Sequence, residues 1–109
     1  MKPLAASAAL IAAVFGAATA FAADPAAGKK VAQGTCAVCH GLDGIAKNPD
    51  APHLAGENIE YLLRQLKAFK SGERKHEQMS IIAQGLSDDD MANASAWYSS
   101  IKIKAEMPK

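Results

Sequence analysis

The amino-acid sequence predicts an all-α fold, and three observations support this class. Two segments carry apolar residues at helical spacing, namely Tyr61, Leu62, Leu66 and Phe69 in one and Met91, Ala94, Tyr98 and Ile101 in the other. Three residues that commonly begin helices, Asp24, Asn58 and Ser87, precede candidate helical segments. No stretch alternates polar and apolar residues as a half-buried strand does. We therefore expect an all-α domain of three to four helices.

The first helix is expected to begin at Pro25. The carboxylate of Asp24 can accept a hydrogen bond from a free N–H group of the first turn. Proline suits the first helical position, because the N–H that it lacks would have no partner there. The helix runs through Ala32 and leads directly into a pair of cysteines.

The region from Gly41 to Gly56 is predicted to be a loop, because glycine and proline recur along it. Asn58 then caps a second helix that ends at Ser71-Gly72. Residues 73–85 are expected to form a non-helical connection that holds Met79. Ser87 caps the last helix and completes a capping box with Asp90.

The N-terminus is typical of an export signal. Lys2 is followed by an apolar, alanine-rich stretch over residues 4–19, and Ala20-Phe21-Ala22 matches a cleavage pattern. We expect a cleaved signal peptide over residues 1–22, and a single domain over 23–109 that begins at Ala23 or Asp24. An uncleaved membrane anchor is the alternative, but the apolar stretch is short for a span. The predicted location is the periplasm, with no stable membrane insertion after cleavage.

The charge balance argues against nucleic acid as a partner. The chain has 12 Lys and Arg against 11 Asp and Glu, and removal of Lys2 makes the two counts equal. Nucleic-acid binding requires a basic face. The basic residues between Arg64 and Lys75 are a docking surface for an acidic partner or, more simply, a solvated helix face.

The run Cys36-Ala37-Val38-Cys39-His40 is typical of covalent haem attachment. Two thiols at this spacing can form thioethers with the two vinyl groups of one haem, and the next imidazole can bind the iron. A mature chain of roughly 85 residues has a marginal core of its own, so we expect the haem-free chain to be largely unfolded.

Three other interpretations of the two cysteines are weaker. A thioredoxin-like redox pair needs a βαβ setting, which the sequence lacks. A structural zinc site needs further ligands at finger-like spacing, and His53 and His76 do not provide it. A disulfide between Cys36 and Cys39 would close a very small loop and stabilise little.

An electron carrier needs a second axial ligand, and five residues are candidates for it: Met79, Met91, Met107, His53 and His76. Met91 fits core packing, because it continues the apolar face of the last helix. Met107 lies near the C-terminus, where a ligand is poorly held. Met79 can reach the far face of a haem from its connection. His76 stays open as its competitor and would lower the reduction potential.

Several segments occur in the order of a known family: Gly28-Lys29, Cys36 to Gly41, Pro52 to Gly56, Tyr61 to Leu66, Phe69 to Arg74, Met79, and Gly85 to Asp88. On these residues, from Asp24 to about Ile101, the chain resembles a class I monohaem cytochrome c of the short soluble bacterial c-553 type. It is also similar to single domains of the related dihaem cytochromes. One departure is that Ser80-Ile81-Ile82, without proline, follows Met79.

The resemblance implies a role for each site residue. Cys36 and Cys39 hold one haem c, and His40 and Met79 bind its iron. The carbonyl of Pro52 accepts a hydrogen bond from the proximal imidazole. The other residues with an implied role are Leu54, Tyr61 and Leu66 in the haem pocket and Gly28, Trp97 and Tyr98 where the first and last helices cross.

The resemblance also implies a function. With both axial positions filled, the protein is a periplasmic one-electron carrier between other redox proteins, and not an enzyme. We expect a monomer. One alternative is a haem enzyme or sensor with an open distal site, such as a peroxidase-like protein. Another is an electron-transfer subunit associated with a membrane oxidase or reductase.

Overall fold

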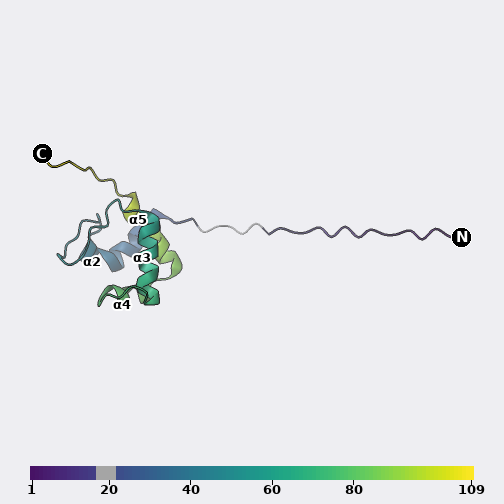
Figure 1. Cartoon of the computed structure of the whole chain (residues 1–109), viewed down its shortest axis with the longest axis horizontal. Helices are drawn as coiled ribbons and strands as arrows, with labels where there is room; N and C mark the ends of the chain where they lie inside the picture. The colour runs from purple at the N-terminus through teal and green to yellow at the C-terminus, as the bar shows by residue number, and fades with distance from the viewer. Residues whose placement is uncertain (17–21) are drawn as a thin grey trace.

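The computed structural model covers residues 1–109 and describes all of them except residues 17–21. In chain order, its elements are α1 (Pro25–Val31), a π-helical turn η1 (Ala32–Cys36), α2 (Ala37–His40), α3 (Ile59–Ser71), α4 (Met79–Gln84) and α5 (Asp88–Ser100). These elements form one helical body (Figure 1), and the described residues contain no strand. The predicted all-α class is confirmed.

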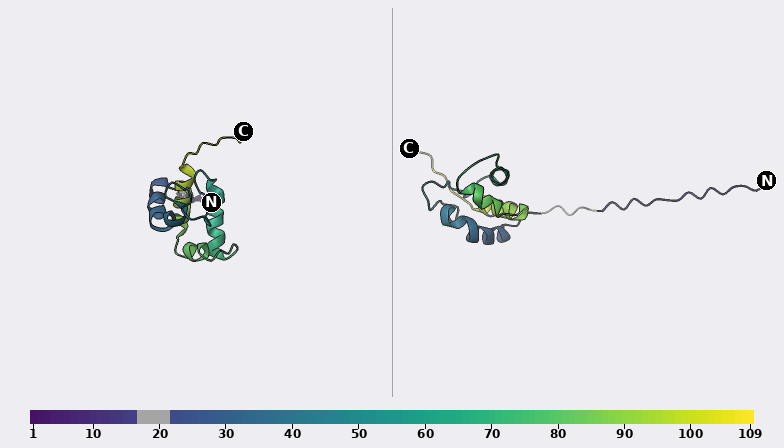
Figure 2. Two further views of the ribbon diagram at one scale, coloured as in Figure 1. Left: turned by 90° about the vertical axis from the view of Figure 1, so that its left-hand side faces the viewer. Right: turned by 90° about the horizontal axis from the view of Figure 1, so that it is seen from below.

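Helix α1 packs against α5, so the two ends of the domain lie side by side (Figure 2, right). The N–H of Asp24 donates to Oδ1 of Asn93 at 2.9 Å. Gly28 is buried at the contact, where a Cβ atom would overlap the backbone carbonyl of Asn93 and lie 3.0 Å from Cβ of Trp97. Only glycine allows the backbones to approach this closely.

The predicted helix ends are confirmed. Oδ1 of Asn58 accepts the N–H of Tyr61 at 3.0 Å at the start of α3. Gly72 ends α3 with φ of 84°, a left-handed conformation that glycine adopts without strain. Ser87 and Asp90 form the expected capping box at the start of α5.

The expectation of a non-helical connection over residues 73–85 is wrong, because residues Met79 to Gln84 form α4. This short helix buries Ala83 completely. Its first turn is held by the side chain of His76, whose Nδ1 accepts the N–H of Met79 at 3.2 Å. With η1 separating α1 from α2, the described residues contain five α-helices rather than the expected three to four.

The N-terminal segment extends away from the helical body (Figure 1), and residues 1–16 are exposed throughout. Part of the predicted apolar stretch, and Ala20 and Phe21 of the predicted cleavage pattern, lie outside the described residues. Among the residues that the structure describes, no helix combines the length and apolarity that a membrane span requires.

The protein's own core is small. Among the residues that the structure describes, five of the ten buried hydrophobic residues are alanines: Ala32, Ala68, Ala83, Ala94 and Ala96. Met91 is 1% exposed, which confirms that it packs in the core. The space left between the helices is a cavity.

Candidate functional site

The cavity has a volume of about 370 Å³ and is lined mainly by residues of η1, α2, α3, α4, α5 and the loop after α2. This volume lies within the usual range of small-molecule sites, about 300–1,000 Å³. The cavity brings together all eight residues that the sequence assigns to haem attachment, iron binding and the haem pocket: Cys36, Cys39, His40, Pro52, Leu54, Tyr61, Leu66 and Met79.

The two cysteines lie on consecutive turns at one side of this cavity. Cys36 ends η1 and Cys39 belongs to α2, and both thiols are free. Of the two residues between them, Val38 is 85% exposed and faces solvent. Burial raises the pKa of the Cys36 thiol to about 11.

His40, the last residue of α2, is 8% exposed. Its Nδ1 lies 2.9 Å from the carbonyl oxygen of Pro52. A carbonyl can only accept, so Nδ1 must carry the hydrogen. The lone pair of Nε2 is therefore free to bind a metal, and the hydrogen bond fixes the orientation of the ring.

Two aromatic residues of α5 hold the backbone that follows His40. The hydroxyl of Tyr98 donates to the carbonyl of Gly41 at 2.9 Å, and Nε1 of Trp97 donates to the carbonyl of Leu42 at 2.9 Å. Tyr98 is 2% exposed, and this burial is the main cause of its raised pKa. Trp97 also lies against Gly28, whereas Tyr98 lines the cavity. The contact between α1 and α5 thus supports the ligand loop.

Met79 and His76 both line the cavity, but the hydrogen bonds of His76 distinguish them. Nδ1 of His76 accepts the N–H groups of Gln78 and Met79, each at 3.2 Å. An imidazole that binds iron through Nε2 carries its hydrogen on Nδ1 and cannot accept there. His76 therefore has the opposite hydrogen-bond polarity to His40. The Met79 side chain is half-buried at the start of α4.

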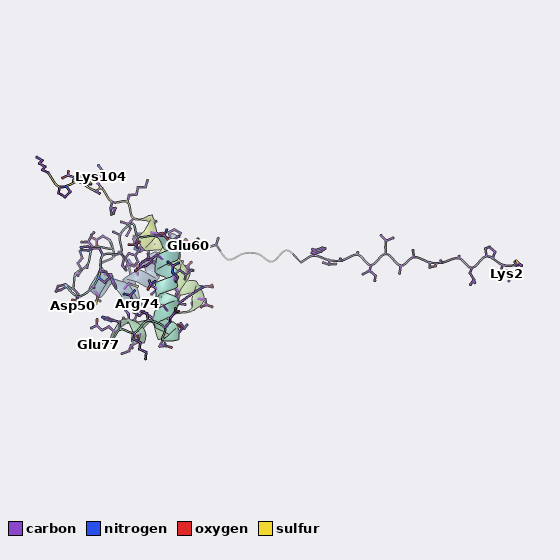
Figure 3. The ribbon with its side chains drawn as sticks, viewed as in Figure 1. Lys2, Asp50, Glu60, Arg74, Glu77 and Lys104 are labelled. Atoms are coloured by element: carbon purple, nitrogen blue, oxygen red, sulfur yellow. The ribbon has the colours of Figure 1, made fainter. Side chains whose placement is uncertain are left out.

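The remaining ligand candidates fit the cavity less well. Nδ1 of His53 accepts the N–H of Ala46 at 2.8 Å, so this ring also has the polarity that opposes iron binding through Nε2. Met107 is 87% exposed on the C-terminal tail, where Lys104 is labelled in Figure 3. In the described part of the chain, no three His, Cys, Asp or Glu residues cluster as a metal site requires.

Three of the basic residues in the stretch from Arg64 to Lys75 make internal contacts, and one of them is Arg64, whose guanidinium lies 5.9 Å from the ring centre of Tyr61. Nζ of Lys70 donates to the carbonyl of Leu86. The guanidinium of Arg74 (labelled in Figure 3) lies 4.6 Å from the ring centre of Phe69, and its Nη1 donates to Gln65 at 2.9 Å. These contacts favour a mainly structural role for this stretch.

Sequence reasoning missed part of the cavity wall. Phe69, Ile82 and Leu86 also line the cavity. Phe69 lies on the predicted apolar face of its helix, so the pattern contained a signal for it. Ile82 belongs to α4, and without that helix its position could not be predicted.

The donor set fits a covalently attached haem. Two thiols at the required spacing, one imidazole with a free Nε2 and one thioether line a single, largely apolar cavity. No further acceptor is needed for the buried groups, because every buried side-chain nitrogen or oxygen of the described residues has a hydrogen-bond partner.

Known proteins resemble this chain over most of its helical domain. The family model for cytochrome c matches residues 25–102. Cytochrome c-554(548) of Halomonas halodenitrificans is 45% identical over 82 residues, which cover 72% of this chain and 98% of that protein. Cytochrome c4 of Pseudomonas aeruginosa is 40% identical over 86 residues, which cover 79% of this chain but 42% of that protein.

The fold is similar to solved structures as well. The crystal structure of reduced recombinant cytochrome c4 from Pseudomonas stutzeri superimposes with a TM-score of 0.68 at 37% identity. The match covers 74% of this chain and 47% of that one, so the chain spans about half the length of the cytochromes c4 that it matches.

Proposed function

This chain belongs to the cytochrome c family, and from that premise we propose that it is a periplasmic one-electron carrier whose haem iron is bound by His40 and Met79. The family attaches haem c covalently, and Cys36, Cys39 and His40 fit its C-x-x-C-H motif. Like its relatives, the protein transfers electrons and is not an enzyme. The periplasmic location, the axial ligands and the partners are our proposals.

The ligand assignment rests on the opposite hydrogen-bonding roles of Nδ1 in two imidazoles that line the same cavity. Nδ1 of His40 donates to Pro52, whereas Nδ1 of His76 accepts from the backbone. This difference supports His40 as the proximal ligand and leaves Met79 as the distal candidate. When bound, haem supplies an iron that changes between ferric and ferrous by one electron.

The chain's own residues keep structural change during electron transfer small. The Pro52 carbonyl fixes the ring of His40, and the side chains of Tyr98 and Trp97 fix the loop behind it. Apolar walls such as Leu54 and Leu66 exclude water from the cavity, and a thioether ligand favours the ferrous state. A rigid site of this kind suits repeated exchange with other redox proteins.

The N-terminus supports export. Residues 1–16 are exposed, and the helical body begins with Asp24, whose side chain caps α1. We propose that residues 1–22 form a signal peptide that is removed on export, and that haem is attached in the periplasm. The intact mass of the haem-bearing protein tests this point, since it reports both the cleavage position and the attached haem.

One set of spectra tests the ligand assignment. A pyridine haemochrome of the thioether type is expected, together with the far-red charge-transfer band of ferric iron bound by methionine. Met79→Ala is expected to abolish that band and to open the iron to cyanide. A wild-type protein that lacks the band and binds cyanide or CO rapidly would instead be a haem enzyme or sensor.

A further inference from the structure

The turn before α4 is held by the side chain of His76. Gln78, directly before α4, makes no side-chain capping bond. Nδ1 of His76 accepts the N–H groups of Gln78 and Met79 at 3.2 Å each. The backbone N–H of His76 donates to Oγ of Ser80 at 3.0 Å, and the backbone carbonyl of His76 accepts the N–H of Ser80 at 3.0 Å. Four hydrogen bonds therefore join His76 to Gln78 and to the first two residues of α4.

The imidazole of His76 is also fixed from the side. Its ring meets the ring of Phe69 edge-on, with 6.5 Å between the centroids and an interplanar angle of 73°. Phe69 is 7% exposed on α3, so it provides a rigid support. Both rings line the cavity that contains Cys36, Cys39 and His40, and both also line a second hollow of about 480 Å³ that is more open to solvent. The His76 ring thus belongs to the wall between the cavity and the solvent.

These contacts act on the backbone of Met79. A capping side chain satisfies N–H groups that have no partner within the first turn. Here one of these groups belongs to the residue that we propose as the distal ligand. Without an acceptor at position 76, the first turn of α4 loses its side-chain cap and can fray. The Met79 side chain then leaves the cavity more often.

We propose that His76 is a positioning residue for the distal ligand, which it holds by capping the turn that contains Met79. The inference rests on the proposed function, in which Met79 binds the iron. In this inference His76 positions Met79 instead of binding the iron itself. Asparagine, which also accepts a backbone N–H at helix starts, should replace it.

The test compares His76→Ala and His76→Asn with the wild-type haem-bearing protein. The rate of cyanide capture by the ferric form measures how often the distal ligand leaves the iron. Loss of one cap is expected to speed capture about fivefold in His76→Ala and to weaken the far-red band, whereas His76→Asn stays close to wild type. Ser80→Ala, a milder change, should move capture in the same direction.

Ser87→Ala is the matched control. It removes a cap of the same kind from α5, whose first turn contains no proposed ligand. Its cyanide capture should be unchanged although its stability falls. Equal capture in wild type and in the Ala and Ser80→Ala variants overturns the inference, as does an equal rise in Ser87→Ala.

Failure of the proposed function gives a different result. If the wild-type protein lacks the far-red band, Met79 does not bind the iron, and the inference about His76 fails together with the proposed function. If the band is present in wild type and lost in Met79→Ala, but capture does not respond to position 76, only the positioning role is wrong.

Discussion

At the residue scale, the backbone behind the proximal histidine depends on two donors from the last helix. Tyr98 donates to the carbonyl of Gly41, and Trp97 donates to that of Leu42. Gly41 is buried, so its carbonyl has no access to water as a substitute partner. An unpaired buried carbonyl costs about 1–3 kcal/mol. These two bonds therefore stabilise both the fold and the position of His40.

Tyr98→Phe should lower the free energy of unfolding by about 1–2 kcal/mol, because the Gly41 carbonyl loses its donor. Urea unfolding of the haem-bearing protein measures the change. Tyr61→Phe is the control, since Tyr61 is 42% exposed. A Tyr98→Phe protein as stable as wild type would mean that the bond contributes nothing.

The burial of Tyr98 should also lower the free energy of unfolding at alkaline pH. Burial raises the pKa of Tyr98 above its usual value in the unfolded chain, about 10. The phenol therefore stabilises the fold fully below that pH, and the contribution is lost as the pH rises toward the raised pKa. The stability advantage of wild type over Tyr98→Phe should shrink above about pH 10. Unfolding free energies of both proteins along a pH series check this, and a constant difference contradicts it.

At the element scale, the crossing of α1 and α5 has no room for a side chain at Gly28. The Cβ atom of any other residue would overlap the carbonyl of Asn93, which belongs to the backbone of α5 and cannot rotate away. The helices would have to separate, and the hydrogen bond between Asp24 and Asn93 would break with them.

Gly28→Val should destabilise the protein by about 3 kcal/mol, since overpacking at a helix contact forces backbone shifts. Thermal or urea unfolding of the haem-bearing protein measures this. Gly34→Ala is the control, because a Cβ atom at this position would have no atom within 4 Å outside its own stretch of helix and its chain neighbours. If both variants behave alike, the close approach does not limit the packing.

Elements with local signals could be predicted from the sequence, and those without them could not. The starts of α1, α3 and α5 follow from Asp24, Asn58 and Ser87, because capping acts over three residues. Helix α4 has six residues and is capped by a histidine, which is not a usual capping residue. The haem motif was local and predictable. Whether Nδ1 of His76 donates or accepts a hydrogen bond depends on the backbone geometry around it, which no residue pattern specifies.

At the scale of the whole molecule, the polypeptide provides too little core for its size. Half of the buried hydrophobic residues in the described part of the chain are alanines, and the centre of the domain is the cavity. A domain this small buries only about 60% of the surface that its unfolded chain exposes. The haem must therefore supply much of the apolar contact that joins α3, α4 and α5.

The double variant Cys36→Ala, Cys39→Ala, which cannot attach haem through thioethers, should be largely unfolded. Far-ultraviolet circular dichroism of the purified variant is expected to lose most of the helical signal of the haem-bearing protein. Native helicity in the variant would show that the polypeptide folds without its cofactor.

The pairing of α1 with α5 has a consequence for the order of events during biogenesis. Translocation begins at the N-terminus, so on the proposed export route the last helix crosses the membrane only after the two cysteines have emerged. Until then α1 has no surface to close upon. Because the haem-free chain is expected to be largely unfolded, both thiols stay accessible to the attachment machinery until haem is bound, and the C-terminal helix pairs with α1 only afterwards.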